Sequence, residues 1–157
     1  MTRRIQLALI SVVIMAVCGV IRTTAAVGAH TRSLLSSTAG RASLVQYARR
    51  YIGVRYVYGG VSPRTGFDCS GFTRFVYAHF GIMLPHQAAQ QWAMGRSVPR
   101  SALRPGDLVF FDDLGHVGLY LGGGMFIHAP HTGARVEVSS LNGWYMNTFD
   151  GARRLTT

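Results

Sequence analysis

The sequence predicts an α+β fold in which N-terminal helices pack on a C-terminal antiparallel β-sheet. Apolar residues recur at helical spacing in the first half of the chain, and short segments rich in Val, Ile, Phe and Tyr follow in the second half. Helices and strands thus fall into separate blocks instead of alternating. With 157 residues, 48% of them hydrophobic, the chain is long enough for one domain with its own core.

The N-terminal segment has the pattern of a secretory signal peptide, predicted over residues 1–29. The basic start MTRR precedes an almost wholly apolar run over residues 5–21, and small residues suited to cleavage follow. The alternatives are an uncleaved membrane anchor or a lipid-modified Cys18. A short polar linker is expected over residues 30–40 and one domain over 41–157, exported to the periplasm or cell envelope or released.

Three helices are predicted in the first half of the domain. The first begins at Ser43, because six apolar residues up to Ile52 fall on one stripe. The second begins at Asp68 or Cys69, after a loop rich in turn-forming residues, VSPRTG. A third, shorter helix is expected around His86–Met94.

Four short strands are predicted after the RPGD turn, in which Asp107 is interpreted as a turn residue. They are DLVFF, HVGLYL, MFIHA and RVEVSS, and they favour an antiparallel meander. The glycine turn between the second and third strands sets Leu119 opposite residue 127. Because of this register, we expect His116 and His128 to lie close together at one end of the sheet.

Cys69 is the only cysteine left once residues 1–29 are removed, so the exported domain can form no intramolecular disulfide. At a helix start, free backbone N–H groups and the helix dipole favour thiolate over thiol and lower the cysteine pKa. This placement indicates a nucleophile. The alternative is a buried structural cysteine.

A cysteine nucleophile needs a base, and His116 with His128 could supply a base and its orienting partner. Other histidines, such as His30, His79 and His131, are interpreted as ordinary residues. A zinc site formed by Cys69, His116 and His128 is the competing interpretation. These residues lack the tight ligand spacing typical of zinc sites, so no metal is expected.

Several motifs, in the order in which they occur along the chain, resemble those of the NlpC family of cell-wall cysteine peptidases. The motifs are YVYGG, GFDCSGF, GIMLPH, LRPGDLVFF, HVGLYLGGG and IHAP, and the resemblance covers about residues 44–141. It implies a compact papain-like fold and an exported endopeptidase without a cofactor. The expected reaction is hydrolysis of amide bonds in peptidoglycan stem peptides, between D-glutamate and the diamino acid. An inactive wall-binding module on the same fold is the alternative.

The resemblance also implies catalytic roles. Cys69 matches the family's nucleophile, and His116 matches the general base that later protonates the leaving amine. His128 matches the residue that orients this base. Tyr56, in YVYGG, matches a tyrosine whose hydroxyl lies near the oxyanion of the tetrahedral intermediate.

Three further residues are candidates for substrate binding. The resemblance implies that Asp68 and Ser70 help to recognise the free amine or backbone of the substrate, although Asp68 is equally suited to cap the helix. His86 stands where the family often has arginine. It could meet a substrate carboxylate with a charge that depends on pH.

The balance of charge fits an anionic partner. Sixteen basic residues against six acidic residues give a formal net charge of +10, which would hold the protein near the acidic groups of peptidoglycan. Nucleic-acid binding is not expected, because the arginines are scattered and no binding motif is present. Membrane contact is expected only if the N-terminal segment is retained, and a monomer is expected.

Overall fold

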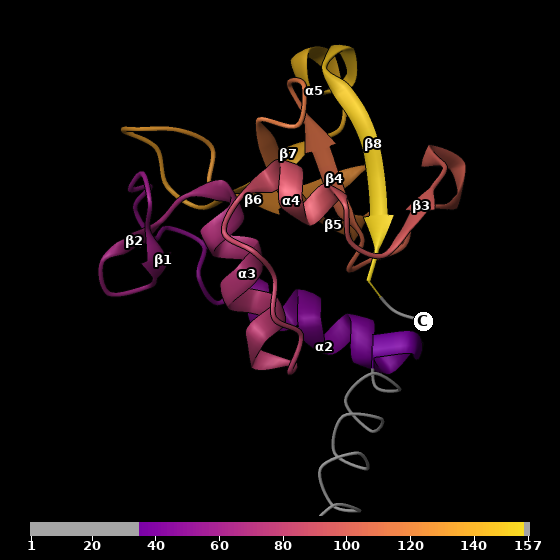
Figure 1. Ribbon diagram of the computed structural model, residues 1–157, viewed down its shortest axis with the longest axis horizontal. Coiled ribbons are helices and arrows are strands. Elements are labelled where there is room, and N and C mark those ends of the chain that lie inside the picture. The colour runs from indigo at the N-terminus through magenta and orange to yellow at the C-terminus, as the bar shows by residue number, and fades with distance from the viewer. Residues whose placement is uncertain (1–34, 156–157) are drawn as a thin grey trace, which may run out of the picture. The chain divides into compact units, whose positions relative to one another are not determined.

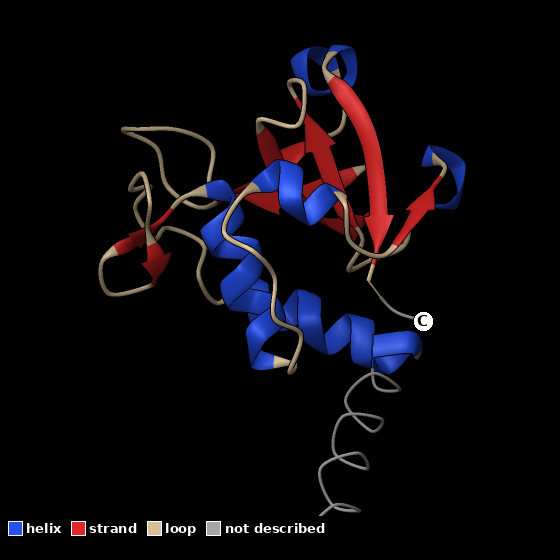
Figure 2. Ribbon diagram, in the orientation of Figure 1, coloured by secondary structure: helices blue, strands red, loops and turns tan. Residues whose placement is uncertain are grey.

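The computed structural model describes residues 35–155, shown in Figures 1 and 2. The helices are α2 (Thr38–Arg49), α3 (Cys69–His79), α4 (Ala88–Trp92) and α5 (Gly143–Asn147), with a 3₁₀ turn at Arg100–Ala102. The strands are β1 (Val61–Ser62), β2 (Gly66–Phe67), β3 (Arg96–Val98), β4 (Leu108–Phe111), β5 (His116–Gly122), β6 (Met125–His128), β7 (Glu137–Ser140) and β8 (Phe149–Arg154).

The predicted α+β architecture is confirmed, and the predicted meander forms four neighbouring strands of the main sheet, β4 to β7. The main sheet has six antiparallel strands in the order β3-β8-β4-β5-β6-β7. Leu119 pairs with Ile127, which is the register that the glycine turn predicts. Strand β8 was not predicted. It comes from the C-terminal segment FDGARR, whose charges and glycine hide its strand character, and it inserts between β3 and β4.

The first helix begins earlier than its apolar stripe suggests. Thr38 is the first residue of α2, and the Ser37 side chain caps the helix by accepting a hydrogen bond from the Gly40 N–H at 3.0 Å. Leu35 is buried, with 1% of its surface exposed. The packed domain therefore includes part of the segment 30–40, for which a linker is predicted.

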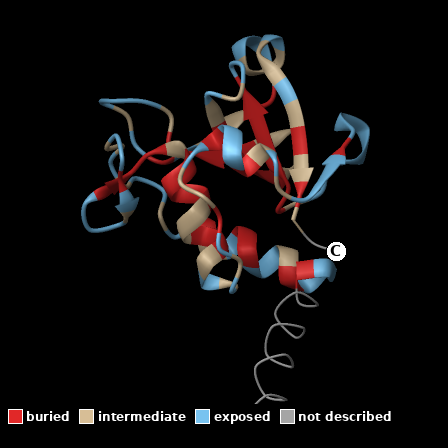
Figure 3. Cartoon of the chain, viewed as in Figure 1, coloured by how far each residue is buried: buried red, intermediate tan, exposed pale blue. Residues whose placement is uncertain are grey.

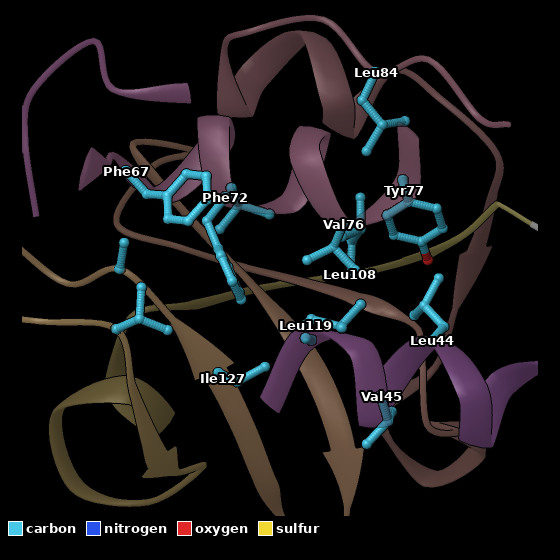
Figure 4. Close-up of a cluster of buried hydrophobic side chains, with 14 of the residues drawn as sticks. Leu44, Val45, Phe67, Phe72, Val76, Tyr77, Leu84, Leu108, Leu119 and Ile127 are labelled. Carbon is cyan, nitrogen blue, oxygen red and sulfur yellow. The ribbon is translucent and has the colours of Figure 1, made fainter. Parts of the chain in front are cut away.

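The two long helices contribute to a core on one face of the sheet (Figure 4). Leu44 of α2 and Val76 of α3 belong to the same buried cluster as Leu119 and Ile127 of the sheet. Because side chains alternate along a strand, the neighbours of these sheet residues lie on the other face. There Phe126 belongs to a second cluster, against which α5 packs. Figure 3 shows that the central strands are buried along most of their length.

The predicted signal peptide, with its alternatives of a membrane anchor or a lipid-modified Cys18, lies outside the described residues. Within residues 35–155, no helix combines the length and apolar character needed to span a membrane.

Asp107 is more than a turn residue. Its carboxylate accepts the Arg104 N–H at 2.8 Å, as a turn residue does. It also forms a buried ion pair with Arg154 of β8, at 2.7 Å from Nε and 2.6 Å from Nη2. The exposed fractions are 0% for Asp107 and 4% for Arg154. This pair fastens the C-terminal strand to the start of β4.

Removal of one partner of this ion pair should destabilise the domain. Asp107→Ala leaves the Arg154 guanidinium buried without its carboxylate. We expect the free energy of unfolding in urea to fall by about 3–5 kcal/mol. The exposed Arg100→Ala is the control, expected to change it by less than about 0.5 kcal/mol. A loss below about 1 kcal/mol for Asp107→Ala would show that the pair does not anchor β8.

Candidate active site

The N-terminus of α3 opens onto a cleft of about 390 Å³. Five of the seven site residues predicted from the sequence line this cleft: Tyr56, Asp68, Cys69, Ser70 and His86. On its other side the cleft reaches Leu114 and Gly115, which directly precede His116. The fold therefore brings the helix tip and the start of β5 together at one site.

Cys69 is the first residue of α3 and remains partly exposed to the cleft. Burial raises the pKa of its thiol, and the neighbouring Asp68 carboxylate acts in the same direction. Hydrogen bonds from the backbone N–H groups of Val117, Ser70 and Cys69 itself lower this pKa. Burial is the largest of these effects, so the resting group is a thiol. The sequence-based expectation of a lowered pKa considered only the helix terminus.

The Cys69 thiol lies near the start of β5. Val117 belongs to β5 and follows His116 directly, and its backbone N–H is close enough to the thiol to lower the pKa of Cys69. The Cys69 sulfur thus lies between the tip of α3 and the strand that carries the predicted base.

Asp68 caps α3 and connects three segments of the chain. Its carboxylate accepts the Gly71 N–H at 2.6 Å and the Ser70 hydroxyl at 3.2 Å, both in the first turn of the helix. It also accepts the Gly59 N–H at 3.0 Å and a hydrogen bond from His86 Nε2 at 2.8 Å. A carboxylate can only accept, so His86 Nε2 carries the proton. The contact with the Gly71 N–H confirms the prediction that Asp68 caps the helix.

His86 and Ser70 both lie against the cap in this structure. His86 is directed to the Asp68 carboxylate, and its Nε2 is 2.8 and 3.0 Å from the two oxygens. Ser70 is 5% exposed and donates to the same carboxylate. Their predicted roles in substrate binding stay predictions.

Gln91 is a positioning residue that the sequence did not single out. It is fully buried in α4, and its amide donates to the Ser70 carbonyl at 2.9 Å and to the Pro85 carbonyl at 2.8 Å. Its Oε1 accepts the Thr73 hydroxyl at 2.7 Å. One amide thus holds the first turn of α3 against α4 and the preceding loop. The sequence predicts a short helix here but gives no signal that singles out this polar residue.

The glycine of DCSG allows a close approach of backbone segments. A Cβ atom at Gly71 would lie 2.0 Å from the carbonyl oxygen of Gly60, which a folded chain cannot accommodate. This carbonyl accepts the Asp68 N–H at 3.0 Å. The turn at YGG therefore packs directly on the first turn of α3.

The two predicted histidines are in contact. His116 Nε2 lies 2.8 Å from His128 Nδ1, across adjacent strands β5 and β6. His128 is fully buried, whereas His116 is partly exposed. With Nε2 engaged, the nitrogen of His116 that is left for proton transfer is Nδ1.

Burial keeps both histidines neutral at physiological pH. It lowers the pKa of His116 to about 4, assisted by repulsion from His131. It lowers the pKa of His128 to about 3, and the neighbouring His116 and His131 act in the same direction. A neutral imidazole beside a thiol is the state that a general base requires.

Tyr56 reaches the cleft from the segment that pairs with β2. A bridge to Phe67 and a hydrogen bond from its N–H to the Ala134 carbonyl at 2.9 Å hold its backbone. Burial raises the pKa of the Tyr56 hydroxyl, and the neighbouring Cys69 and Asp68 raise it further. A neutral phenol near the sulfur can donate a hydrogen bond to a developing oxyanion.

The loop before His116 has an unusual backbone. Asp112, Asp113 and Leu114 have φ values of 60°, 51° and 64°, in the left-handed region that costs non-glycine residues energy. The Leu114 N–H donates to the Asp150 carboxylate at 2.8 Å, which helps to hold this turn. The turn brings Leu114 and Gly115 to the wall of the cleft.

The zinc interpretation would require Cys69, His116 and His128 to converge on one point. Among residues 35–155, no group of three or more His, Cys, Asp or Glu side chains is arranged to hold a metal ion.

Comparison with known proteins gives consistent matches. The model of the NlpC/P60 family matches residues 53–154. Gamma-DL-glutamyl hydrolase of Bacillus subtilis is 42% identical over 118 residues, which are 71% of this chain and 28% of that protein. Murein DD-endopeptidase MepH of Escherichia coli is 42% identical over 115 residues, 68% of this chain and 42% of MepH. The chain thus spans less than half the length of either relative.

Solved structures show the same similarity. An NlpC/P60 family protein from Bacillus cereus superimposes with a TM-score of 0.68 at 37% identity, covering 73% of this chain and 39% of that one. The NlpC/p60 domain of the peptidoglycan hydrolase SagA gives a TM-score of 0.65 at 40% identity, covering 73% of this chain and 97% of that domain.

Proposed function

The chain belongs to the NlpC/P60 family, and from this premise we propose that it is an exported cysteine endopeptidase that hydrolyses amide bonds in peptidoglycan stem peptides. The observation that carries the proposal is the geometry of the cleft, which is lined by Cys69 at the tip of α3 and by Leu114 and Gly115 directly before His116, together with the contact of 2.8 Å between His116 Nε2 and His128 Nδ1. This cleft brings a cysteine at a helix tip close to the strand that begins with a neutral, partly exposed histidine. Export rests on the sequence pattern of residues 1–29.

The reaction begins with the thiol and the imidazole both neutral. As the Cys69 sulfur attacks the carbonyl carbon of the scissile amide, its proton passes to Nδ1 of His116. The tetrahedral oxyanion accepts hydrogen bonds from the Tyr56 hydroxyl and the Cys69 N–H. His116 then protonates the leaving amine, and water hydrolyses the resulting thioester with the same histidine as base. His128 orients the ring of His116 throughout.

The proposed bond lies between D-glutamate and the diamino acid. A relative named gamma-DL-glutamyl hydrolase supports this choice, whereas a relative named murein DD-endopeptidase favours the cross-link as the second candidate. Mass spectrometry of defined muropeptides after digestion separates them, because each bond yields fragments of different mass. The net charge of +10 supports attraction to the anionic wall.

Substitutions in the catalytic set should reduce turnover in a definite order. Cys69→Ser should lose several orders of magnitude in kcat, because a hydroxyl has a far higher pKa than a thiol. His116→Ala should lose nearly as much, while His128→Ala should retain measurable activity. The assay is release of muropeptide fragments, and the exposed His79→Ala is the control.

Two treatments separate this proposal from its alternatives. Iodoacetamide should abolish turnover while EDTA leaves it unchanged, and the reverse pattern would favour a zinc hydrolase. Wall binding by a wild-type protein without turnover would favour the inactive module. Loss of activity in His128→Ala but not in His116→Ala would reverse the assigned roles.

The pH profile should reflect the lowered pKa of His116. The base is neutral above about pH 4, so kcat/KM should stay level from about pH 7 to pH 5 and fall only near pH 4. An acid limb centred near 6.5, the ordinary histidine pKa, would contradict the buried environment.

The profile must be measured on folded protein. Both histidines have lowered pKa values in the folded state, so below about pH 6.5 the unfolded chain binds protons that the folded chain does not. Stability therefore falls on acidification, and circular dichroism at each pH distinguishes unfolding from titration of the base.

A further inference from the structure

The histidine pair is not the end of the hydrogen-bond chain that begins at His116. His128 Nε2 lies 3.0 Å from the Ser139 hydroxyl of β7 and 3.4 Å from the Tyr145 hydroxyl of α5. The Ser139 hydroxyl in turn lies 3.5 Å from the Glu137 carboxylate. The hydrogen-bond chain therefore runs across three strands and ends at an acidic side chain.

Strand register explains why these groups meet. His128 pairs with Glu137, and Phe126, two residues before His128, pairs with Ser139. Alternate residues of a strand share a face, so the histidine, the serine and the glutamate lie on the same side of the sheet. Tyr145 packs on this side, with its ring 5.3 Å from the ring of His128.

The proton between the two histidines can be placed in two ways. If His116 Nε2 carries it and donates to His128 Nδ1, then Nδ1 of His116 is bare and can accept the thiol proton. If His128 Nδ1 carries it, neutral His116 has its proton on Nδ1 and cannot act as the base. Activity requires the first arrangement.

The Glu137 carboxylate, at the end of the hydrogen-bond chain, selects between these two arrangements of the proton. A carboxylate can only accept, so the Ser139 hydroxyl donates to Glu137 and its oxygen accepts from His128 Nε2–H. A neutral His128 with its proton on Nε2 has a bare Nδ1, which accepts from His116. Because His128 is fully buried, its Nε2–H depends on these protein partners.

We propose that Ser139 and Glu137 are positioning residues that hold both histidines in the tautomer leaving Nδ1 of His116 free. This proposal rests on the proposed function of the site. No proton travels along the chain: the thiol proton stays on His116 until it passes to the leaving amine, and His128 remains neutral. Tyr145 supplies a second, longer contact to His128 Nε2.

The direct test is the tautomeric state of the two histidines. Long-range ¹H–¹⁵N correlation spectra of the wild-type protein at pH 7, without substrate, identify which ring nitrogen carries the proton. We expect the Nε2–H tautomer for both His116 and His128. The Nδ1–H tautomer at either residue would overturn the proposal, whatever the protein hydrolyses.

Kinetics of variants give the second readout. Ser139→Ala should lower kcat roughly 10-fold with little change in KM, and the histidine spectra should show loss of the single tautomer. Glu137→Gln should act in the same direction, because its amide can donate a hydrogen bond where a carboxylate only accepts. The effect should be smaller, because the amide oxygen can still accept. Ser139→Thr, which keeps the hydroxyl, should retain most of the activity.

Ser140→Ala is the matched control, since it lies one residue along β7 on the other face of the strand. If Ser139→Ala matches Ser140→Ala in kcat and keeps the wild-type tautomers, the proposal fails. If the tautomers are as expected but no muropeptide is cleaved, the positioning role stands and the proposed function fails.

Discussion

The carboxylate of Asp68 is the contact on which the rest of the site depends. It accepts hydrogen bonds from the Gly59 turn, from two residues in the first turn of α3 and from His86. Charge-assisted hydrogen bonds of this kind are roughly twice as strong as neutral ones. One side chain thereby caps α3 at Cys69 and holds the Gly59 turn and His86 against the start of this helix.

The site has two halves, and the protein orders them by different means. Buried polar groups on the helix side, Asp68 and Gln91, hold the first turn of α3 in place. On the sheet side, strand register brings His116 and His128 into contact. The two halves meet at one cleft, which is lined by Cys69 and by Leu114 and Gly115 directly before His116. Burial acts on both halves. It disfavours the thiolate of Cys69 and the imidazolium of His116, so that both groups are neutral in the resting protein.

Local features of the sequence predicted helices α2, α3 and α4, the meander of β4 to β7 and the register that brings the histidines together. The short elements β3 and α5 were not predicted, and long-range features were missed. Strand β8 pairs with β4 across about forty residues and carries charges that hide it, while its anchor, the Asp107–Arg154 pair, is visible only once the chain is folded. The partners of Gln91 and Ser139 could not be predicted for the same reason. The sign of the Cys69 pKa shift depends on burial, which a helix-terminus argument does not include.

Amide hydrogen exchange in Asp68→Ala tests the central claim most directly. Gly59 and Gly71 donate to this carboxylate from separate segments, so their protection should fall together, by roughly 10-fold for each lost contact of about 1.4 kcal/mol. Asp68→Asn, which keeps an acceptor oxygen, should show an intermediate loss. If both amides stay protected while KM alone rises, Asp68 is a ligand of the substrate and not the anchor of the site.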